Sequence, residues 1–369
     1  MILKKFSARD FRNINKCEIE FSPGVNLLHG NNAEGKTNVI EGIYLFSRGK
    51  SFRAREDSEL VGFGKEGFSL SIEYSDSFGD GRLEYSLFGR ERQRKKNGYK
   101  IGRVAEMIGS FRSVLFQPDN LSLVKGGPEE RRSFLDVAIS QCEPSYIKYY
   151  SDYKKALTER SCILKFLQKG MPVDRLELDS WSSIMADYAS YVYLMRIEYL
   201  KKISLEAEKI MKEISSDRES LSFEYHSDIQ AESNNREKIR EEYKRILSSS
   251  LDREISAGVT LFGPHREDIK IYINGKEAKS FASQGQQRSV VLSMKLAEGA
   301  VIKEKFGEEP VYLFDDVLSE LDEKRKKYLL SGSFGKQYII TSCDADECMG
   351  YADCIIDVRG GEYVSSYRK

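Results

Sequence analysis

The sequence lacks the features that mark secreted and membrane proteins. No apolar run approaches the roughly 18 residues of a transmembrane helix, so we expect no membrane span. Residues 1–10 have neither the apolar core nor the cleavage site of a signal peptide. The six cysteines are scattered without a C-x-x-C pair, which favours reduced thiols over disulfides or zinc: Cys17, Cys142, Cys162, Cys343, Cys348 and Cys354. These absences predict a soluble cytoplasmic protein.

The chain also lacks net charge. Lys+Arg and Asp+Glu each total 58, so the global balance neither favours nor excludes a nucleic-acid partner, which needs only a local basic surface. With 369 residues, 40% of them hydrophobic and 31% charged, the chain can bury a sizeable core. Its length predicts about two domains.

The first part of the chain has the pattern of strands and turns. Residues 24–29 form a short apolar run that stops at Gly30, which is typical of a buried strand that leads into a loop. Helical spacing follows over residues 38–46. Residues 68–72 and 83–87 alternate with period two and predict paired strands.

The middle of the chain is different. Between about residues 128 and 251 apolar positions recur at helical spacing and glycine almost disappears. Strand patterns return at residues 269–273, which end in the turn dipeptide Asn274-Gly275, and at the buried runs 311–314 and 338–341. The sequence therefore predicts an α/β core whose two halves are separated by a helical insertion.

A phosphate-binding loop is the strongest motif. Residues 30–37 read G-N-N-A-E-G-K-T and match G-x-x-x-x-G-K-[ST] between a predicted strand and helix. Backbone N–H groups of such a loop and the helix N-terminus bind phosphates, Lys36 reaches the β- and γ-phosphates, and Thr37 binds Mg²⁺. We therefore expect ATP and Mg²⁺ as cofactors. The candidate nucleotide ligands are Gly30, Asn31, Asn32, Ala33, Glu34, Gly35, Lys36, Thr37 and Asn38.

A second motif, V-Y-L-F-D-D, occupies residues 311–316. In a P-loop fold the strand beside the phosphate loop delivers an acid to Mg²⁺, so Asp315 is the candidate metal-side carboxylate. Asp316 would then face the attacking water as polariser or general base. By itself, the motif is equally consistent with an ordinary strand that ends in a solvated turn.

Residues 283–288, S-Q-G-Q-Q-R, precede an apolar helical stretch and resemble the signature motif of ABC-type ATPases. Ser283, Gly285 and Gln286 would lie at a helix N-terminus and bind the γ-phosphate held by a second subunit; a plain N-capped helix is the alternative. Gln117 resembles the glutamine that senses Mg²⁺ and the attacking water. Residues 318–322 resemble the loop that crosses the dimer interface.

Two positions depart from the ABC pattern. Asp316 replaces the usual glutamate with a carboxylate one methylene shorter, and Thr341-Ser342 stands where a switch histidine is expected. Both departures predict a slow, switch-like ATPase.

Several further stretches resemble the RecF family of bacterial recombination mediators, and together they extend over most of the chain. These are residues 11–13, 30–38, 50–53, 124–136, 262–268 and 283–288. The resemblance implies an ABC-type, SMC-head-like core (lobe I, residues 1–127 and 256–369) with an inserted helical lobe II (residues 128–255). It also implies a homodimer that forms on ATP, with each Ser283 acting on the partner's nucleotide.

The same resemblance implies a role in recombinational repair and replication-fork maintenance. The dimer would bind duplex DNA near gaps or single-strand junctions and act with RecR and RecO to promote RecA loading. Residues 90–103 hold seven basic residues and one acid around Asn97-Gly98, which predicts a basic hairpin. Its candidate DNA ligands are Arg92, Arg94, Lys95 and Lys96, although a solvated surface hairpin would have the same composition.

Some assignments stay open at this level. Arg53, Arg131 and Arg132 fit the nucleotide or the dimer interface equally well, and His265 fits a structural turn contact better than catalysis. Three alternatives compete with a repair ATPase. A transporter's nucleotide-binding subunit would usually carry the switch histidine, an ATP-binding scaffold would not turn over, and a small-molecule kinase does not explain residues 283–288.

Overall fold

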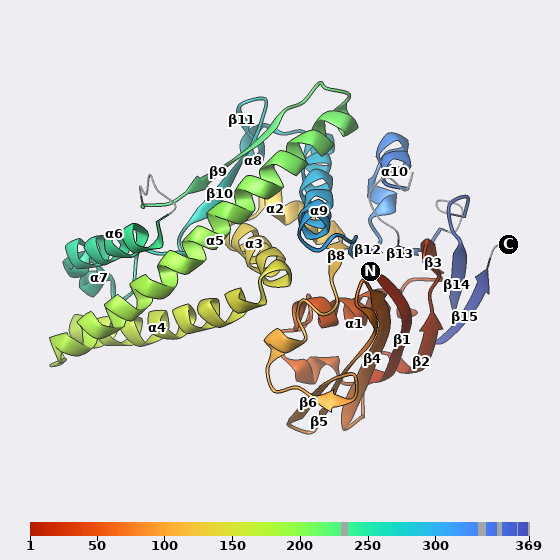
Figure 1. Cartoon of the computed structure of the whole chain (residues 1–369), viewed down its shortest axis with the longest axis horizontal. Helices are drawn as coiled ribbons and strands as arrows, with labels where there is room; N and C mark the ends of the chain where they lie inside the picture. The colour runs from red at the N-terminus through yellow and green to blue at the C-terminus, as the bar shows by residue number, and fades with distance from the viewer. Residues whose placement is uncertain (230–234, 331–336, 345–348, 360, 368–369) are drawn as a thin grey trace.

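A computed structural model describes residues 1–229, 235–330, 337–344, 349–359 and 361–367 (Figure 1). These residues form two six-stranded sheets, one three-stranded sheet and a group of helices that extends away from the larger sheets. Within these ranges no helix combines the length and apolar composition needed to span a membrane. The described cysteines Cys17, Cys142, Cys162, Cys343 and Cys354 are free thiols, and Cys348 lies outside the described residues.

The first six-stranded sheet is mainly parallel and has the order β15-β14-β3-β13-β12-β8. Its strands are β3 (Val25–His29), β8 (Ser113–Phe116), β12 (Val311–Asp315), β13 (Tyr338–Ser342), β14 (Cys354–Arg359) and β15 (Glu362–Tyr367). Leu28 and Leu313 belong to the core on the side of α1 (Lys36–Arg48), whereas Leu27 and Phe314 belong to the core around α9 (Gln284–Phe306). Because both faces are covered, the strands are continuous apolar runs, as predicted for 24–29, 311–314 and 338–341.

The second six-stranded sheet is antiparallel, with the order β2-β1-β4-β5-β6-β7. Its strands are β1 (Ile2–Phe11), β2 (Ile14–Glu20), β4 (Gly67–Asp76), β5 (Gly79–Phe88), β6 (Glu91–Lys96) and β7 (Tyr99–Lys100). One face carries Phe6, Ile72 and Leu83, which belong to the same buried core as residues of α1, and the other faces solvent, which explains the period-two alternation. The predicted turn at Asn97-Gly98 is confirmed, with φ of 50° and 82° at its two residues.

The helical part follows β8 in the chain. It contains α3 (Pro128–Cys142), α4 (Pro144–Gln168), α5 (Arg175–Ser215), α6 (Arg236–Ser249) and α7 (Leu251–Ala257). The long helices α4 and α5 lie side by side and extend from the sheets (Figure 1). The shorter helices are α2 (Ser122–Lys125), α8 (Ala278–Phe281), α10 (Glu323–Leu330), η1 (Asp57–Leu60), η2 (Val104–Glu106), η3 (Pro118–Leu121) and η4 (Leu318–Glu320).

One prediction for this region is wrong. Residues 221–226, expected to be helical, form strand β9, which pairs with β10 (Asp268–Ile273) in a sheet completed by β11 (Lys276–Glu277). Leu221 is buried and Phe223 and Tyr225 are half-buried, while the residues between them are exposed, so the local period is two. The strand forms because β10, more than 40 residues away in the chain, supplies its hydrogen-bonding edge.

A buried ion pair anchors α5 to α3. The Arg196 guanidinium, whose side chain is fully buried, donates to both carboxylate oxygens of Asp136 (2.8 and 3.0 Å) and to the Pro264 carbonyl (2.6 Å). A buried charge needs such complete pairing to offset its desolvation. The contact therefore fixes the long helix against the segment that leads back to β10.

Candidate nucleotide site

The loop between β3 and α1 has the geometry of a phosphate site. Gly35 precedes α1 with φ of 108°, and no side chain caps the helix, so its first N–H groups remain available to a ligand. Lys36 Nζ lies within the loop and donates to the carbonyls of Gly30 (2.7 Å) and Asn31 (2.8 Å). These groups fit the phosphates of a nucleotide.

Two asparagines, Asn13 and Asn38, form hydrogen bonds beside the phosphate loop. Asn13, in the turn between β1 and β2, donates to the Ala33 carbonyl (2.9 Å) and accepts from Asn38 Nδ2 (2.6 Å). A Cβ at Gly35 would come within 3.0 Å of Asn13 Oδ1 and 2.9 Å of the Tyr363 hydroxyl. Glycine is therefore needed at this position for space as well as for its φ.

Thr37 and Asp315 meet at the edge of the parallel sheet, although 278 residues separate them. Thr37 Oγ1 donates to Asp315 Oδ1 at 2.8 Å. Burial raises the pKa of Asp315, and the hydroxyls of Thr37 and Thr341 partly offset that shift by hydrogen bonding to the carboxylate. One hydroxyl and one carboxylate oxygen at a single point fit Mg²⁺, which keeps several of its own waters.

Gln117 and Asp316 leave neighbouring strands at this same edge. Phe116 of β8 pairs with Phe314 of β12 in parallel register, so Gln117 and Asp315 are the next residues on each strand. Asp316 has a left-handed φ of 54°, and its N–H donates to Thr341 Oγ1 (3.0 Å). Within the described part of the chain its half-buried carboxylate has no hydrogen-bonding partner, so it is available to a ligand.

The segment that resembles a signature motif begins α9. Ser283 Oγ accepts from the Gln286 N–H (3.3 Å), and Gln286 Oε1 accepts from the Ser283 N–H (2.9 Å), which makes a complete capping box. The Gly285 carbonyl accepts from Arg325 Nη2 (3.0 Å). Among the described residues no hydrogen bond joins 283–286 to 30–38. Ser283 itself is exposed and accessible to a second molecule.

The structure separates the arginines that sequence reasoning left open. Arg53 Nη1 donates to Asn38 Oδ1 (3.0 Å) and pairs with buried Glu41 (3.8 Å), so it lies beside the phosphate loop. Arg131 instead donates to both oxygens of Asp268 (2.8 Å each), and Arg132 to the Glu267 carbonyl (2.9 Å). These two arginines tie α3 to β10.

His265 is a structural residue, as predicted. Its Nε2 donates to the Thr260 carbonyl (3.2 Å), which leaves Nδ1 to accept from the Tyr153 hydroxyl (2.6 Å). Burial lowers its pKa to about 4. The neutral ring therefore holds a turn together.

The four basic residues of the hairpin do not share one face. Arg92, Arg94 and Lys96 pair with buried Leu87, Tyr85 and Leu83 of β5 and lie on the inner side of the sheet. There Arg92 pairs with Asp57 (2.6 Å), the Arg94 guanidinium lies 4.9 Å from the Tyr85 ring centre, and Lys96 donates to Ser110 (2.9 Å).

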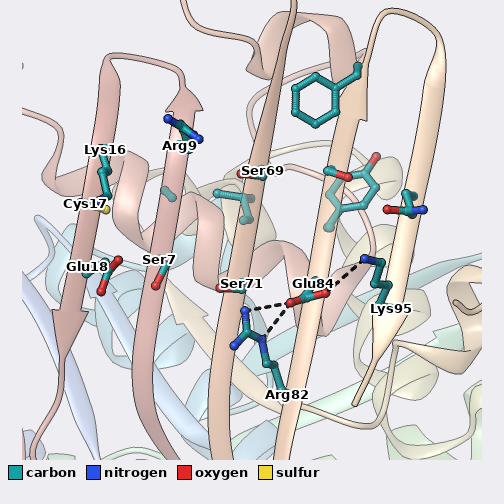
Figure 2. Close-up of a pocket in the computed structure, with 16 residues that line it drawn as sticks. Ser7, Arg9, Lys16, Cys17, Glu18, Ser69, Ser71, Arg82, Glu84 and Lys95 are labelled. Carbon is teal, nitrogen blue, oxygen red and sulfur yellow. Dashed lines mark hydrogen bonds and ion pairs between the residues drawn. The ribbon is translucent and has the colours of Figure 1, made fainter. Parts of the chain in front are cut away.

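Lys95 lies on the outer side of the same sheet. Its ammonium pairs with Glu84 (3.9 Å), which also binds Arg82, beside a hollow of about 430 Å³ (Figure 2). Arg92 and Lys95 are therefore paired with acids of the same chain, and Arg92, Lys95 and Lys96 remain partly exposed at the edge of the hairpin.

Sequence reasoning gave no role to three residues of the site. Asn13 belongs to a stretch that resembles the family, yet its contact with the phosphate loop depends on how the β1–β2 turn folds back. The contact of Thr341 with the site can be recognised only from the register between β12 and β13. Arg325 links Asp322 to Gly285 through its guanidinium, a contact that depends on how α10 packs against the start of α9.

Comparison with known proteins gives consistent matches over the whole chain. The family model described as RecF/RecN/SMC N terminal domain matches residues 2–362. The "DNA replication and repair protein RecF" of Clostridioides difficile (strain 630) is 36% identical over 374 residues, which cover 99% of this chain and 98% of that protein.

Solved structures agree with this match. The structure titled "recombination mediator protein RecF-ATP in RecFOR pathway" is similar with a TM-score of 0.91 and 36% identity, covering 100% of this chain and 97% of that one. An Smc head domain from Pyrococcus furiosus, covering 99% and 96%, has a TM-score of 0.57 at 18% identity and shares the fold alone. The predicted fold class, an ABC-type, SMC-head-like core with an inserted helical part, is confirmed. The chain belongs to the RecF family of DNA replication and repair proteins.

Proposed function

We propose that this protein is a slow ATPase of recombinational repair that binds Mg²⁺-ATP, dimerises on it and binds duplex DNA near gaps. The contact of Thr37 with Asp315, beside the uncapped N-terminus of α1, carries the proposal. The similar RecF structure has ATP in its title, which supports the choice of nucleotide. Lys36 and the loop N–H groups would bind the phosphates, and Thr37 and Asp315 would hold Mg²⁺. The bound metal would neutralise charge on the phosphates.

Asp316 would act on the attacking water with Gln117. A carboxylate without a competing hydrogen bond can accept a proton from water or orient it. Because this side chain is one methylene shorter than glutamate and no histidine follows β13, we expect slow turnover.

The nucleotide would be enclosed by two subunits. Residues 30–38 of one chain would bind the phosphates from one side, and Ser283, Gly285 and Gln286 of the other would approach the γ-phosphate. The exposed N-terminus of α9 favours this arrangement, since its hydroxyl and N–H groups suit an anion. We propose lobe I as residues 1–127 and 256–369 and lobe II as residues 128–255.

We further propose that the dimer acts in the cytoplasm with RecR and RecO to promote RecA loading. The relatives named for DNA replication and repair, and the solved structure placed in the RecFOR pathway, support this role. Arg92, Arg94, Lys95 and Lys96 of the hairpin remain the candidate DNA ligands, and Arg92, Lys95 and Lys96 are partly exposed.

The first test is ATP hydrolysis with and without gapped duplex DNA, together with the molar mass by light scattering with and without ATP. We expect turnover that DNA stimulates and a mass that doubles on ATP. Turnover indifferent to DNA from a protein monomeric throughout would instead fit a transporter subunit. ATP binding without any turnover would fit a scaffold.

A further inference from the structure

Thr341 lies between the two acids of the candidate site. It occupies the carboxyl end of β13, beside β12, and its register partner is Asp315. Its side chain is buried. The hydroxyl lies 2.9 Å from Asp315 Oδ1 and 3.0 Å from the N–H nitrogen of Asp316, with a more distant approach of 3.4 Å to the Phe314 carbonyl.

The protons of these groups fix the direction of both bonds. A hydroxyl has one proton to donate and lone pairs that accept. The Asp316 N–H can only donate, so Thr341 Oγ1 accepts there and directs its own proton to the Asp315 carboxylate. One side chain thus holds the carboxylate of the first acid and the backbone of the second.

The backbone of Asp316 needs such a restraint. Its φ of 54° lies in the left-handed region, which residues with a Cβ adopt only when their surroundings stabilise it. Its carboxylate has no hydrogen-bonding partner among the described residues, so no such bond fixes its direction. The N–H bond to Thr341 is therefore a restraint on where this acid lies.

The carboxylate of Asp315 has two hydroxyl donors that come from different sides. Thr37 donates from the phosphate loop (2.8 Å), and Thr341 from the sheet (2.9 Å). Thr37 lies at the start of α1, next to the phosphate loop, and is itself a candidate Mg²⁺ ligand. Thr341 belongs to the buried sheet, so its bond holds Asp315 from the sheet side.

We propose that Thr341 is a positioning residue for ATP hydrolysis, which acts through Asp315 on the metal side and through the Asp316 backbone on the water side. The inference rests on the proposed ATPase function. Thr341 stands where the ABC pattern has its switch segment, and it contacts both acids from the side of the sheet.

The test compares Thr341→Val, which keeps the shape but removes the hydroxyl, with Thr341→Ser, which keeps the hydroxyl. We expect kcat of the valine variant to fall by about 10- to 100-fold, the usual effect of losing a partner that orients a metal-site ligand. KM should change by less than about threefold, because the lost interaction concerns the reacting geometry. The serine variant should recover most of kcat.

A second readout does not depend on turnover. Binding of a fluorescent ATP analogue in EDTA should be unchanged in Thr341→Val, while the Mg²⁺ concentration that promotes tight binding should rise several-fold. Thr260→Val is the matched control, since Thr260 is equally buried but binds Arg160 (2.9 Å) in the helical part. That control should leave kcat and the Mg²⁺ dependence unchanged.

Three results would overturn the proposal. The first is a native kcat in Thr341→Val, and the second is equal impairment of the serine and valine variants. The third is that Thr341→Val loses as much nucleotide binding in EDTA as it does with Mg²⁺. If the native protein hydrolyses no ATP, the proposed function fails. In that case the Mg²⁺ dependence of analogue binding still decides the role of Thr341 at Asp315.

Discussion

At the scale of single residues, a substitution at Asp316 should separate ATP binding from ATP hydrolysis most clearly. Its carboxylate has no hydrogen bond within the described residues, and the proposed nucleotide and metal contacts come instead from Lys36, Thr37 and Asp315. Asp316→Asn should therefore leave ATP affinity nearly unchanged while turnover falls about 100-fold or more, as expected for loss of a general base. Phosphate release at saturating ATP and filter binding measure the two quantities. Asp316→Glu keeps the carboxylate and should remain active; undiminished release by the asparagine variant would contradict the assignment.

His265 links protonation to stability. Its pKa is lowered to about 4 by burial, so the folded ring stays neutral where the unfolded chain already takes up a proton near pH 6.5. Above pH 6.5 the ring is neutral in both states, and the protein keeps the full stability that depends on a neutral His265. As the pH falls from 6.5 toward 4, the unfolded chain gains a proton that the folded protein does not, so this stability is lost. Lowering the pH to 5 should cost about 2 kcal/mol through this residue.

Urea unfolding of the native protein and His265→Asn at pH 7.5 and pH 5 isolates that contribution. Asparagine does not titrate, so the variant should lose less stability between the two pH values. Equal losses in both proteins would show that the histidine is protonated in the folded state.

At the scale of elements, one buried ion pair helps to hold α5 against α3. Arg196→Ala leaves Asp136 without its guanidinium partner and should lower the free energy of unfolding by about 3–5 kcal/mol. Arg245→Ala on α6 breaks an exposed pair with Glu242 (2.6 Å) and should change the free energy of unfolding much less, because solvent screens an exposed ion pair. Urea titration of both variants checks this contrast, and similar losses would argue against a special role for the buried pair.

The elements also show what can be predicted from sequence. The phosphate loop and the strands at 311–314 and 338–341 follow from local patterns, so their positions are predictable. Strand β9 is not, because its pairing with β10 is a tertiary contact. The role of Thr341 escapes sequence reasoning for a similar reason, since it depends on strand register.

The hairpin at residues 90–103 shows a second limit of prediction from sequence. Its turn at Asn97-Gly98 is predictable, but the sequence alone presents the four basic residues as one patch. A strand places alternate side chains on opposite faces, so Lys95 has to separate from Arg92, Arg94 and Lys96. The ion pairs of Arg92 with Asp57 and of Lys95 with Glu84 cannot be foreseen, because those interactions need the folded sheet.

At the scale of the whole molecule, DNA affinity tests the hairpin. Replacing Arg92, Arg94, Lys95 and Lys96 with alanine should reduce the slope of log affinity against log salt by about 0.9 for each DNA phosphate that the variant no longer neutralises. The control variant removes the same charge from the helical part, at exposed Lys155, Lys169, Lys201 and Lys202. An unchanged slope in the hairpin variant, with a reduced slope in the control, would move the DNA site to the helices.

The proposed dimerisation would depend on Ser283, for which we propose no role in binding nucleotide within its own chain. Ser283 is exposed at the start of α9, and no hydrogen bond joins it to residues 30–38 in the described part of the structure. Ser283→Arg places a bulky side chain where the partner's γ-phosphate would approach. We therefore expect unchanged ATP binding by the monomer and loss of the ATP-dependent increase in mass, measured by light scattering.

The substitution also removes a helix cap, which costs about 1 kcal/mol and needs its own control. Asn235→Arg makes the same kind of change at the N-cap of α6, where Asn235 Oδ1 accepts from Glu237 N–H (2.9 Å). That variant should dimerise normally, because α6 lies in the helical part, away from the signature segment. If Ser283→Arg dimerises as the native protein does, the nucleotide is not shared between subunits, and the role of residues 283–286 is limited to capping α9.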